Sequence, residues 1–323
     1  MNPLDIWYVI FQHCELLSQS RLFAVCSDFY QSFFITDMYD IPNTYRYKLT
    51  NLILRQKKFN RIIKLDITAN HHINDISFLM NLKKLYIRDN GEISQSGIKG
   101  LDLIELNSNQ NKKIRDVSFM TNLKILYADG HCNIDQQGIR GLNLFELNVD
   151  NNKKIKDVSF MTNLKKLDAC NYCEINQQGV RGLNLIELNA SDNEKIQDVS
   201  FMTNLKKLGA CGRYGITQPG IQGLDLIELY VDDNNEINDV SFMVNLKILH
   251  ASFFCGIDQH GIQRLGLIEL QVRDNKKIKD VSFMTNLKHL NANGTCGINE
   301  QGIQGLNLNY LNTFGNKHFF IRC

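Results

Sequence analysis

Cysteine is the residue type in this sequence whose spacing most directly suggests chemistry. Cys170 and Cys173 form a C-x-x-C pair, a spacing that is typical of redox and metal sites. Cys173 also belongs to a series of cysteines that recur at multiples of 41 residues, which comprises Cys132, Cys173, Cys255 and Cys296. The chain has nine cysteines, an odd number whose placement follows this interval rather than a pairing, so we interpret them as free thiols. Whether they can share a metal depends on the elements that carry them.

Acidic and histidine residues do not form a catalytic set in the sequence. Asp129, Asp150, Asp192 and Asp274 are spread along the chain rather than gathered, and the eight histidines have no metal-ligand spacing. The sequence also has no phosphate-binding loop and no nucleophile elbow. We therefore expect no catalytic residue, no metal and no cofactor, and we predict that the chain is not an enzyme.

The charge balance and hydropathy limit the classes of partner. The 323 residues include 36 basic and 34 acidic side chains, a formal net charge of +2, and they contain no basic block. This composition argues against nucleic acid as a partner. No apolar run approaches the length of a membrane span, and residues 1–11 carry no basic leader. We therefore expect no membrane partner and a cytoplasmic or nuclear location.

A repeated tetrapeptide, Asp-(Val/Ile)-Ser-Phe, shows how most of the chain is organised. Its copies are 41 residues apart and begin at Asp75, Asp116, Asp157, Asp198, Asp239 and Asp280. A fixed period of this size indicates a stacked array, in which each unit buries its apolar face against its neighbours. The L-x-x-L-x-(small or apolar) pattern that begins at Leu82 returns after 21 residues at Leu103 and after 20 more at Leu123. The repeat therefore alternates between two versions of 20 and 21 residues.

This pattern resembles the leucine-rich repeat family, whose signature is L-x-x-L-x-L-x-x-N/C-x-L. The resemblance extends from Ile62 to the C-terminus. It implies an α/β solenoid, a leucine-rich-repeat horseshoe with a parallel concave sheet, in which residues 62–323 make about 13 units. We expect the Val, Phe and Met of segments such as Asp157–Met161 to pack inward as part of its core.

The ninth position of the shorter version is always asparagine, and the series comprises Asn111, Asn152, Asn193, Asn234, Asn275 and Asn316. We expect each amide to bond the backbone of the turn that leaves the strand. The longer version usually has cysteine one position later. Because neighbouring parallel strands lie about 4.8 Å apart, cysteines on alternate repeats would stand roughly 10 Å apart, too far for a disulfide or a shared zinc. We interpret them as small buried apolar residues.

The concave face of such an array presents positions three, five and seven of each repeat, while position eight leaves the strand. At position three, lysine and glutamate alternate on neighbouring strands, as at Lys84 and Glu105, so we expect them to pair. Two consecutive strands carry a less regular, aromatic and acidic set that comprises Tyr230, Asp232, Asp233, His250, Ser252 and Phe253. We predict that this cluster binds a protein partner. The alternative is that Phe253 and Phe254 only fill a local loop.

Residues 1–40 do not follow the repeat, and their apolar spacing predicts short amphipathic helices. Pro3-Leu4-Asp5-Ile6 and Arg21-Leu22-Phe23-Ala24-Val25-Cys26 resemble the F-box, which usually opens L-P-x-E-(I/L) and ends R-L-S-L-V-C-K-x-W. Asp5, Ser27 and Phe29 depart from that pattern. The resemblance implies a small α-helical module that docks on a Skp-family adaptor of a cullin ubiquitin ligase. The residues implied in that contact are Pro3, Leu4, Ile6, Ile10, Leu22, Val25 and Cys26.

Residues 41–61 are expected to form a helical connector that caps the first repeat. Ile41-Pro42 disfavours helix at Ile41, and Asn43 is placed to cap a helical run from Tyr45 to Lys57.

These resemblances together predict the substrate-recognition subunit of a Skp-cullin-F-box type ubiquitin ligase. The F-box would bind the adaptor, and the concave face would bind a protein target that the sequence does not identify. The alternative is an adaptor-free leucine-rich-repeat scaffold whose N-terminal helices only cap the array. A secreted adhesin fits less well, because it calls for a signal peptide and paired cysteines. The uniform repeats and the richness in Asn, Ile and Lys resemble F-box/leucine-rich-repeat proteins of large DNA viruses of amoebae, which implies action in a host cell.

Overall fold

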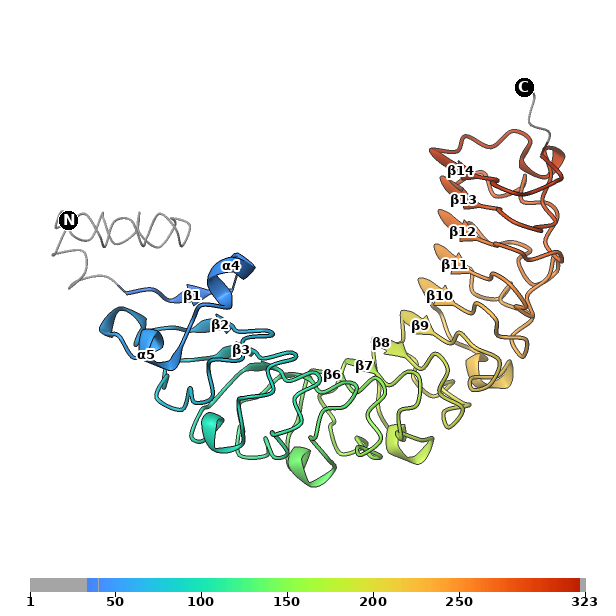
Figure 1. Ribbon diagram of the computed structural model, residues 1–323. Helices are drawn as coiled ribbons and strands as arrows, with labels where there is room; N and C mark the ends of the chain where they lie inside the picture. The colour runs from blue at the N-terminus through green and yellow to red at the C-terminus, as the bar shows by residue number, and fades with distance from the viewer. Residues whose placement is uncertain (1–33, 40, 320–323) are drawn as a thin grey trace, which may run out of the picture. The chain divides into compact units, whose positions relative to one another are not determined.

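Short parallel strands joined by turns build two compact units, which divide after Ile155. The structure is a computed structural model that describes residues 34–39 and 41–319. Each unit is a parallel β-solenoid of the leucine-rich-repeat type, in which every strand pairs with the strand of the next repeat (Figure 1). The seven residues that the F-box resemblance assigns to the adaptor contact lie outside the described residues.

The described part of unit 1 begins with a two-residue strand that the sequence did not predict. This strand, β1, pairs in parallel with β2, so that Asp37 lies opposite Lys64 and Met38 opposite Leu65. The strands of unit 1 are β1 (Asp37–Met38), β2 (Lys64–Asp66), β3 (Lys84–Tyr86), β4 (Glu105–Asn107), β5 (Ile125–Tyr127) and β6 (Glu146–Asn148). Its helices within residues 34–39 and 41–155 are α4 (Asn43–Arg46) and α5 (Asn51–Leu54), with 3-10 turns at Lys57–Phe59, Ser96–Ile98 and Gln137–Ile139.

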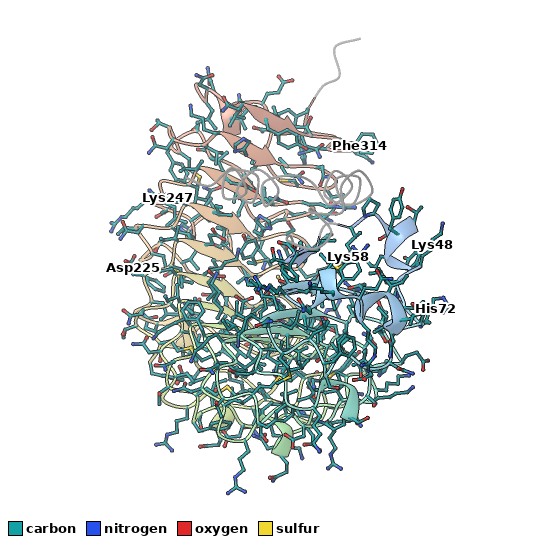
Figure 2. The ribbon with its side chains drawn as sticks, turned by 90° about the vertical axis from the view of Figure 1, so that its left-hand side faces the viewer. Lys48, Lys58, His72, Asp225, Lys247 and Phe314 are labelled. Atoms are coloured by element: carbon teal, nitrogen blue, oxygen red, sulfur yellow. The ribbon has the colours of Figure 1, made fainter. Side chains whose placement is uncertain are left out.

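Unit 2 continues the same architecture with one strand in each repeat. Its strands are β7 (Lys166–Asp168), β8 (Glu187–Asn189), β9 (Lys207–Gly209), β10 (Glu228–Tyr230), β11 (Ile248–His250), β12 (Glu269–Gln271), β13 (His289–Asn291) and β14 (Tyr310–Asn312). Its 3-10 turns are Gln178–Val180, Pro219–Ile221 and Gln301–Ile303. After β14, Phe314 is 86% exposed, and Figure 2 shows its side chain pointing away from the strands.

The strand positions follow the leucine pattern of the sequence. The middle residue of each strand from β2 to β13, such as Leu85 or Leu229, is a buried leucine. Its two neighbours in the strand are at most partly buried in most repeats, as at Lys84 and Tyr86. We call the surface formed by these outward positions the strand face. The predicted charge pairs lie on it: the ammonium of Lys84 is 2.8 Å from Glu105, and the ammonium of Lys207 is 2.9 Å from Glu228.

Buried asparagines close the turn after every second strand, as the sequence predicts. The Asn234 amide donates to the carbonyl oxygens of Ala210 and Ile216, at 2.8 and 3.0 Å. Its side-chain oxygen accepts the N–H groups of Glu236 and Ile237. The two bonds that the amide donates recur in both units, at Asn111, Asn152, Asn193, Asn275 and Asn316. These amides connect each shorter repeat to the preceding longer one.

A glutamine forms a second connection, which the sequence analysis did not predict. The Gln218 amide donates to the carbonyl of Asp239 at 2.8 Å, and its oxygen accepts the N–H groups of Asn238 and Asp239 at 2.9 Å each. Gln95, Gln177 and Gln259 make the equivalent bonds. Each of these glutamines therefore satisfies three backbone groups of the next repeat, which would otherwise depend on water.

Two expectations about packing are wrong. The Val and Met of the repeated Asp-Val-Ser-Phe-Met segment are buried, but its phenylalanine is about two-fifths exposed, with Phe160 at 40%. The ring lies at the edge of the turn because the backbone there is a turn rather than a helix that would carry it inward. Residues 45–57 do not form one helix. Thr50 caps the separate helix α5 by accepting the N–H of Ile53, and only part of this segment packs inward: Leu54 is 1% exposed, whereas Leu52 is 79% exposed.

The backbones of successive repeats approach each other closely at one glycine of each longer repeat. A Cβ atom added to Gly220 would lie 2.0 Å from the carbonyl oxygen of Gln197 in the preceding repeat. Equivalent contacts of 2.0–2.4 Å occur at Gly97, Gly138, Gly179, Gly261 and Gly302. The glycine carbonyl also accepts a backbone hydrogen bond, as from Val199 to Gly220 at 2.9 Å. No side chain fits at this position without separating the repeats.

We therefore expect Gly220→Ala to lower the free energy of unfolding by about 2 kcal/mol or more, since overpacking at a fixed backbone contact costs about that much. The urea midpoint followed by circular dichroism measures the change. Gly91→Ala is the matched control, because a Cβ there would have nothing within 4 Å. Equal midpoints for the two variants would contradict the close approach of the repeats.

Candidate functional site

Tyr230 and His250 form an aromatic pair at the centre of the strand face of unit 2. The register of β10 and β11 places them directly opposite each other. Their ring centroids are 4.5 Å apart with an interplanar angle of 69°, an edge-to-face contact. The structure thus brings together two of the residues that the sequence predicts to bind a partner.

A charged pair holds the tyrosine side of this contact. The Tyr230 hydroxyl donates to Glu228 at 2.9 Å, and the ammonium of Lys207 lies 2.9 Å from the same carboxylate. The Lys207 ammonium also lies 5.3 Å from the centre of the Tyr230 ring. The hydrogen bond between Lys207 and Glu228 lowers the pKa of Glu228, and the same bond raises the pKa of Lys207. Burial, followed by the bond to Glu228, raises the pKa of Tyr230, so the phenol stays protonated.

A second carboxylate holds the histidine side. Nε2 of His250 lies 3.3 Å from Glu269, and the Gln271 amide donates to the same carboxylate oxygen at 2.9 Å. Residues from β9 to β12 therefore form one continuous polar and aromatic network. The side chains of this network already order one another. Binding of a partner here would therefore cost this protein little further side-chain entropy.

Asp232 and Ser252 also lie together, but their contact supports the backbone. Oδ1 of Asp232 accepts the backbone N–H of Ser252 at 2.7 Å. Ser252 is only 4% exposed, so it offers little surface to a partner. Asn109 and Asp129 make a similar contact in unit 1, where the N–H of Asp129 donates to the Asn109 side chain at 3.0 Å. This contact is a feature of the array.

Asp233 and Phe253 occupy the eighth position of their repeats, beyond the ends of β10 and β11. Both have left-handed backbones, with φ of 60°. Phe253 is 38% exposed, and the following Phe254 is 70% exposed. Both phenylalanines line a pocket of about 480 Å³ whose other walls come from residues 274–277 and Thr295. The sequence predicted a role for Phe253 but gave no sign of this pocket, because residues 274–277 and 295 belong to later repeats.

The strand face of unit 1 carries an aromatic and acidic surface that the sequence analysis did not select. The Tyr86 hydroxyl donates to Glu105 and the Tyr127 hydroxyl to Glu146, at 2.5 and 2.7 Å. Tyr39 packs on Tyr86 with ring centroids 4.8 Å apart. The fifth position of the repeat identifies Tyr86 and Tyr127 in the sequence, but Tyr39 lies before the first repeat and carries no such signal.

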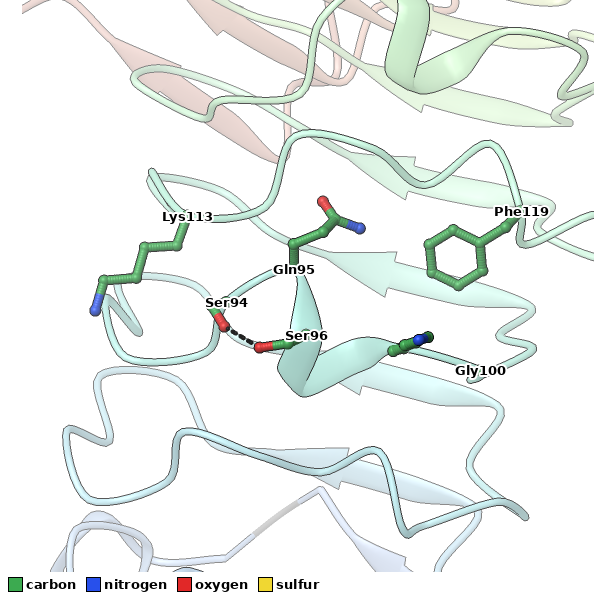
Figure 3. A pocket seen from close by; sticks show the side chains of 7 residues that line it. Ser94, Gln95, Ser96, Gly100, Lys113 and Phe119 are labelled. Carbon is green, nitrogen blue, oxygen red and sulfur yellow. Dashed lines mark hydrogen bonds between the residues drawn. The ribbon is translucent and has the colours of Figure 1, made fainter.

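Unit 1 has a pocket on the turn side, away from the strand face. It has a volume of about 750 Å³ and is lined by Ser94, Gln95, Ser96, Lys99, Gly100, Lys113 and Phe119. Figure 3 shows the Phe119 ring on one side of this hollow and the bonded hydroxyls of Ser94 and Ser96 on the other. Gln95 belongs to the glutamine series and Phe119 to the repeated Phe series. The hollow is thus largely part of the repeated architecture.

The cysteines of the longer repeats are buried, as the sequence predicts. Burial raises the pKa of the Cys255 thiol to about 12 and that of Cys296 to about 11, so both are protonated and weak nucleophiles. Within residues 34–39 and 41–319, no three His, Cys, Asp or Glu side chains gather as a metal site requires. In the same part of the chain, no helix combines the length and apolar character needed to cross a membrane.

Solved structures of internalins share this fold. One is an internalin (inlF) from Listeria monocytogenes str. 4b F2365, which is 23% identical, with a TM-score of 0.58 over 82% of this chain and 84% of that chain. Another is the functional domain of InlJ from Listeria monocytogenes, which includes a cysteine ladder. It is 20% identical, with a TM-score of 0.50 over 80% of this chain and 59% of that one. No family model matches the chain, and no curated protein matches it. At these identities the likeness shows the leucine-rich-repeat fold alone.

The network makes stability depend on pH through Glu228. Its pKa is lower in the folded chain than in the unfolded chain, so the stabilisation is present above the unfolded value of about 4.3 and is lost as the pH falls through the folded value. We expect Glu228→Gln to cost up to about 1 kcal/mol at neutral pH, because both partners are partly exposed and screened by solvent. The variant and the parent should converge in acid.

Urea unfolding between about pH 7 and about pH 3 measures this difference. Glutamine still accepts the Tyr230 hydroxyl, so the aromatic pair is kept. Glu236→Gln, which removes an exposed carboxylate of the same unit, serves as the control. A stability difference for Glu228→Gln that persists unchanged in acid would show that charge pairing with Lys207 is not its cause.

Proposed function

We propose that this chain binds a protein target on the strand face of unit 2, centred on Tyr230 and His250. The observation that carries the proposal is the ordered network from Lys207 to Gln271, which surrounds an aromatic pair on an otherwise charged and amide-rich face. Tyrosine in an ordered setting is a frequent centre of protein interfaces, because it buries a large ring at low entropy cost. The leucine-rich-repeat fold suits this role, since it presents one long face of strands.

We further propose that the bound protein is a substrate for ubiquitin transfer. The support is the sequence resemblance of residues 3–29 to the F-box, joined directly to a leucine-rich array. In this proposal residues 1–40 dock on a Skp-family adaptor, residues 41–61 cap the array, and residues 62–323 hold the target. The chain itself performs no chemistry, and it works in the cytoplasm or nucleus, where such ligases act.

The target contact is tested by Tyr230→Ala. Removing the ring should weaken target binding by about tenfold or more, because hot-spot truncations commonly cost that much. The readout is the amount of target recovered with the tagged chain, measured by quantitative mass spectrometry after crosslinking. Tyr214→Ala is the matched control, since Tyr214 is a 67% exposed tyrosine of the same unit outside the network. Equal recovery with both variants would overturn the assignment to the strand face.

The adaptor contact is tested by the double variant Leu4→Asp, Ile10→Asp. The proposal predicts that the parent chain recovers a Skp adaptor in near-equal amount and that the double variant recovers none, while the circular dichroism spectrum of the array is unchanged. Leu52→Asp, at a 79% exposed position, controls for added charge. Absence of an adaptor from the parent would reject the ligase role. Loss of solubility in the double variant would favour the alternative, an adaptor-free scaffold capped by these residues.

A further inference from the structure

The eighth position of each leucine-rich repeat has a left-handed backbone. The φ angles at this position lie between 54° and 97° in both units. The residues there are Ala69, Asp89, Gln110, Gly130, Asn151, Asn171, Asp192, Gly212, Asp233, Phe253, Asp274, Gly294 and Gly315. Glycine, asparagine and aspartate tolerate this conformation best, whereas a bulky residue costs about 1–2 kcal/mol in it. Phe253 is the one aromatic residue in the series.

The surrounding array does not require an aromatic ring at this position. In the neighbouring longer repeats the equivalent residues are Gly212 and Gly294, and an aspartate of the preceding repeat covers each of them. A Cβ added to Gly294 would lie 2.2 Å from Oδ1 of Asp274, so the side chain is excluded there. Phe253 is 38% exposed rather than buried. The strain at Phe253 therefore serves to display the ring and not to fill the core.

The pocket beside Phe253 combines an apolar wall with a positively charged rim. The rings of Phe253 and Phe254 form the apolar wall of the 480 Å³ pocket. The guanidinium of Arg273 lies 5.4 Å from the Phe253 ring centre, and that of Arg213 lies 5.5 Å from the Phe254 ring centre. Both cations are thus held beside aromatic surface where a ligand would reach them.

The lysines of the pocket add to this charge, while its carboxylate is already occupied. Lys277 donates to the carbonyl of Cys255 at 3.0 Å, and Lys276 is exposed. Asp274 accepts the backbone N–H of Thr295 at 2.8 Å and lies 3.3 Å from the guanidinium of Arg273. The bond from the Thr295 N–H lowers the pKa of Asp274. These donors offset the negative charge of the Asp274 carboxylate. The lysines and Arg213 therefore remain to attract an anion.

We propose that this pocket binds an acidic segment of a polypeptide in which an aromatic or aliphatic side chain is flanked by Asp or Glu. The apolar side chain packs on Phe253 and Phe254, and the flanking carboxylates pair with Lys276 and Arg213. The inference rests on the proposed function, that the chain binds a protein, and it names the chemistry of the segment that the protein presents. A pocket at the end of β11 can hold such a segment beside a larger contact on the strand face.

Selection from a displayed library of random peptides on the full chain tests the proposal. The expected result is enrichment of sequences that place acidic residues beside an aromatic or aliphatic one. Fluorescence polarisation with an enriched peptide then measures affinity. Enriched sequences without acidic residues, or no enrichment at all, would overturn the proposal.

Charge is tested by Lys276→Glu, which should weaken the enriched peptide by about tenfold or more. The repeat accepts glutamate at this position, because Glu194 occupies the equivalent place 82 residues earlier, which is two 41-residue intervals. Lys112→Glu is the matched control: it makes the same charge change at the equivalent position of unit 1, outside the pocket. Equal affinities for the two variants would reject the charged rim as the binding element.

The role of the strained ring is tested by Phe253→Asn, which introduces the residue found at the equivalent Asn171. We expect peptide affinity to fall by about tenfold or more and the midpoint of thermal unfolding to stay level or rise. Arg264→Gly is the control for relief of strain. Its φ is 69°, and glycine stands at the equivalent positions 100, 141, 182, 223 and 305. Arg264→Gly should raise the midpoint and leave affinity unchanged.

A clear fall in the unfolding midpoint of Phe253→Asn would show that the ring is structural, and unchanged affinity would show that it does not bind. Either result overturns the proposal. Failure of the proposed function is distinguishable, because Tyr230→Ala should leave peptide affinity intact. If the peptide depends on Phe253 while target recovery ignores Tyr230, the strand-face assignment fails and the pocket stands.

Discussion

The three or four side-chain hydrogen bonds of each buried asparagine in the series are the interactions on which the rest of the array depends. Asn234 joins two carbonyl groups of the preceding repeat to two N–H groups of its own turn. Without this side chain, those buried groups would lack partners, at a cost of about 1–3 kcal/mol for each group left unsatisfied. The asparagine thereby fixes the turn after the strand, the left-handed residue before it and the distance to the preceding repeat. The glycine contact near Gly220 and the glutamine bridges then set the opposite side of each repeat at the same spacing.

This constraint separates the residues that build the array from those free to act. Leucines, asparagines, glutamines and close-contact glycines recur at fixed positions where they pack or bond the backbone of a neighbouring repeat, so their repetition describes architecture. Side chains on the strand face and in the turn after it meet solvent and are free to vary. Tyr230 and His250 depart from the charge pairs around them by forming an aromatic contact, and Phe253 departs from the small and polar residues of its series. We therefore propose the binding surface at positions where a residue departs from the repeat and the departure benefits the fold least.

The sequence predicted the parallel solenoid and its strand positions through its resemblance to leucine-rich repeats. It predicted the asparagine bonds and the pairing of Lys84 with Glu105 through the residue types that recur at fixed positions of the repeat. It also placed Tyr230 and His250 on the same face through the register. It did not predict the glutamine bridges or the pocket beside Phe253, since these depend on distances between side chains of different repeats. The exposure of Phe160 and the cap at Thr50 were missed because local turn geometry overrides apolar spacing. The left-handed eighth position becomes visible only from backbone angles.

Hydrogen–deuterium exchange of the full chain with and without its purified target tests the central claim most directly. The account predicts that the target slows exchange in β10–β12 and in the turns that follow them, including the amides near Phe253 and Lys276. The remaining repeats should exchange at unchanged rates, because the proposed contact does not reach them. Slowed exchange confined to the glutamine-bearing turns, with β10–β12 unaffected, would contradict the account, because it would place binding on the architecture rather than on the residues that depart from it.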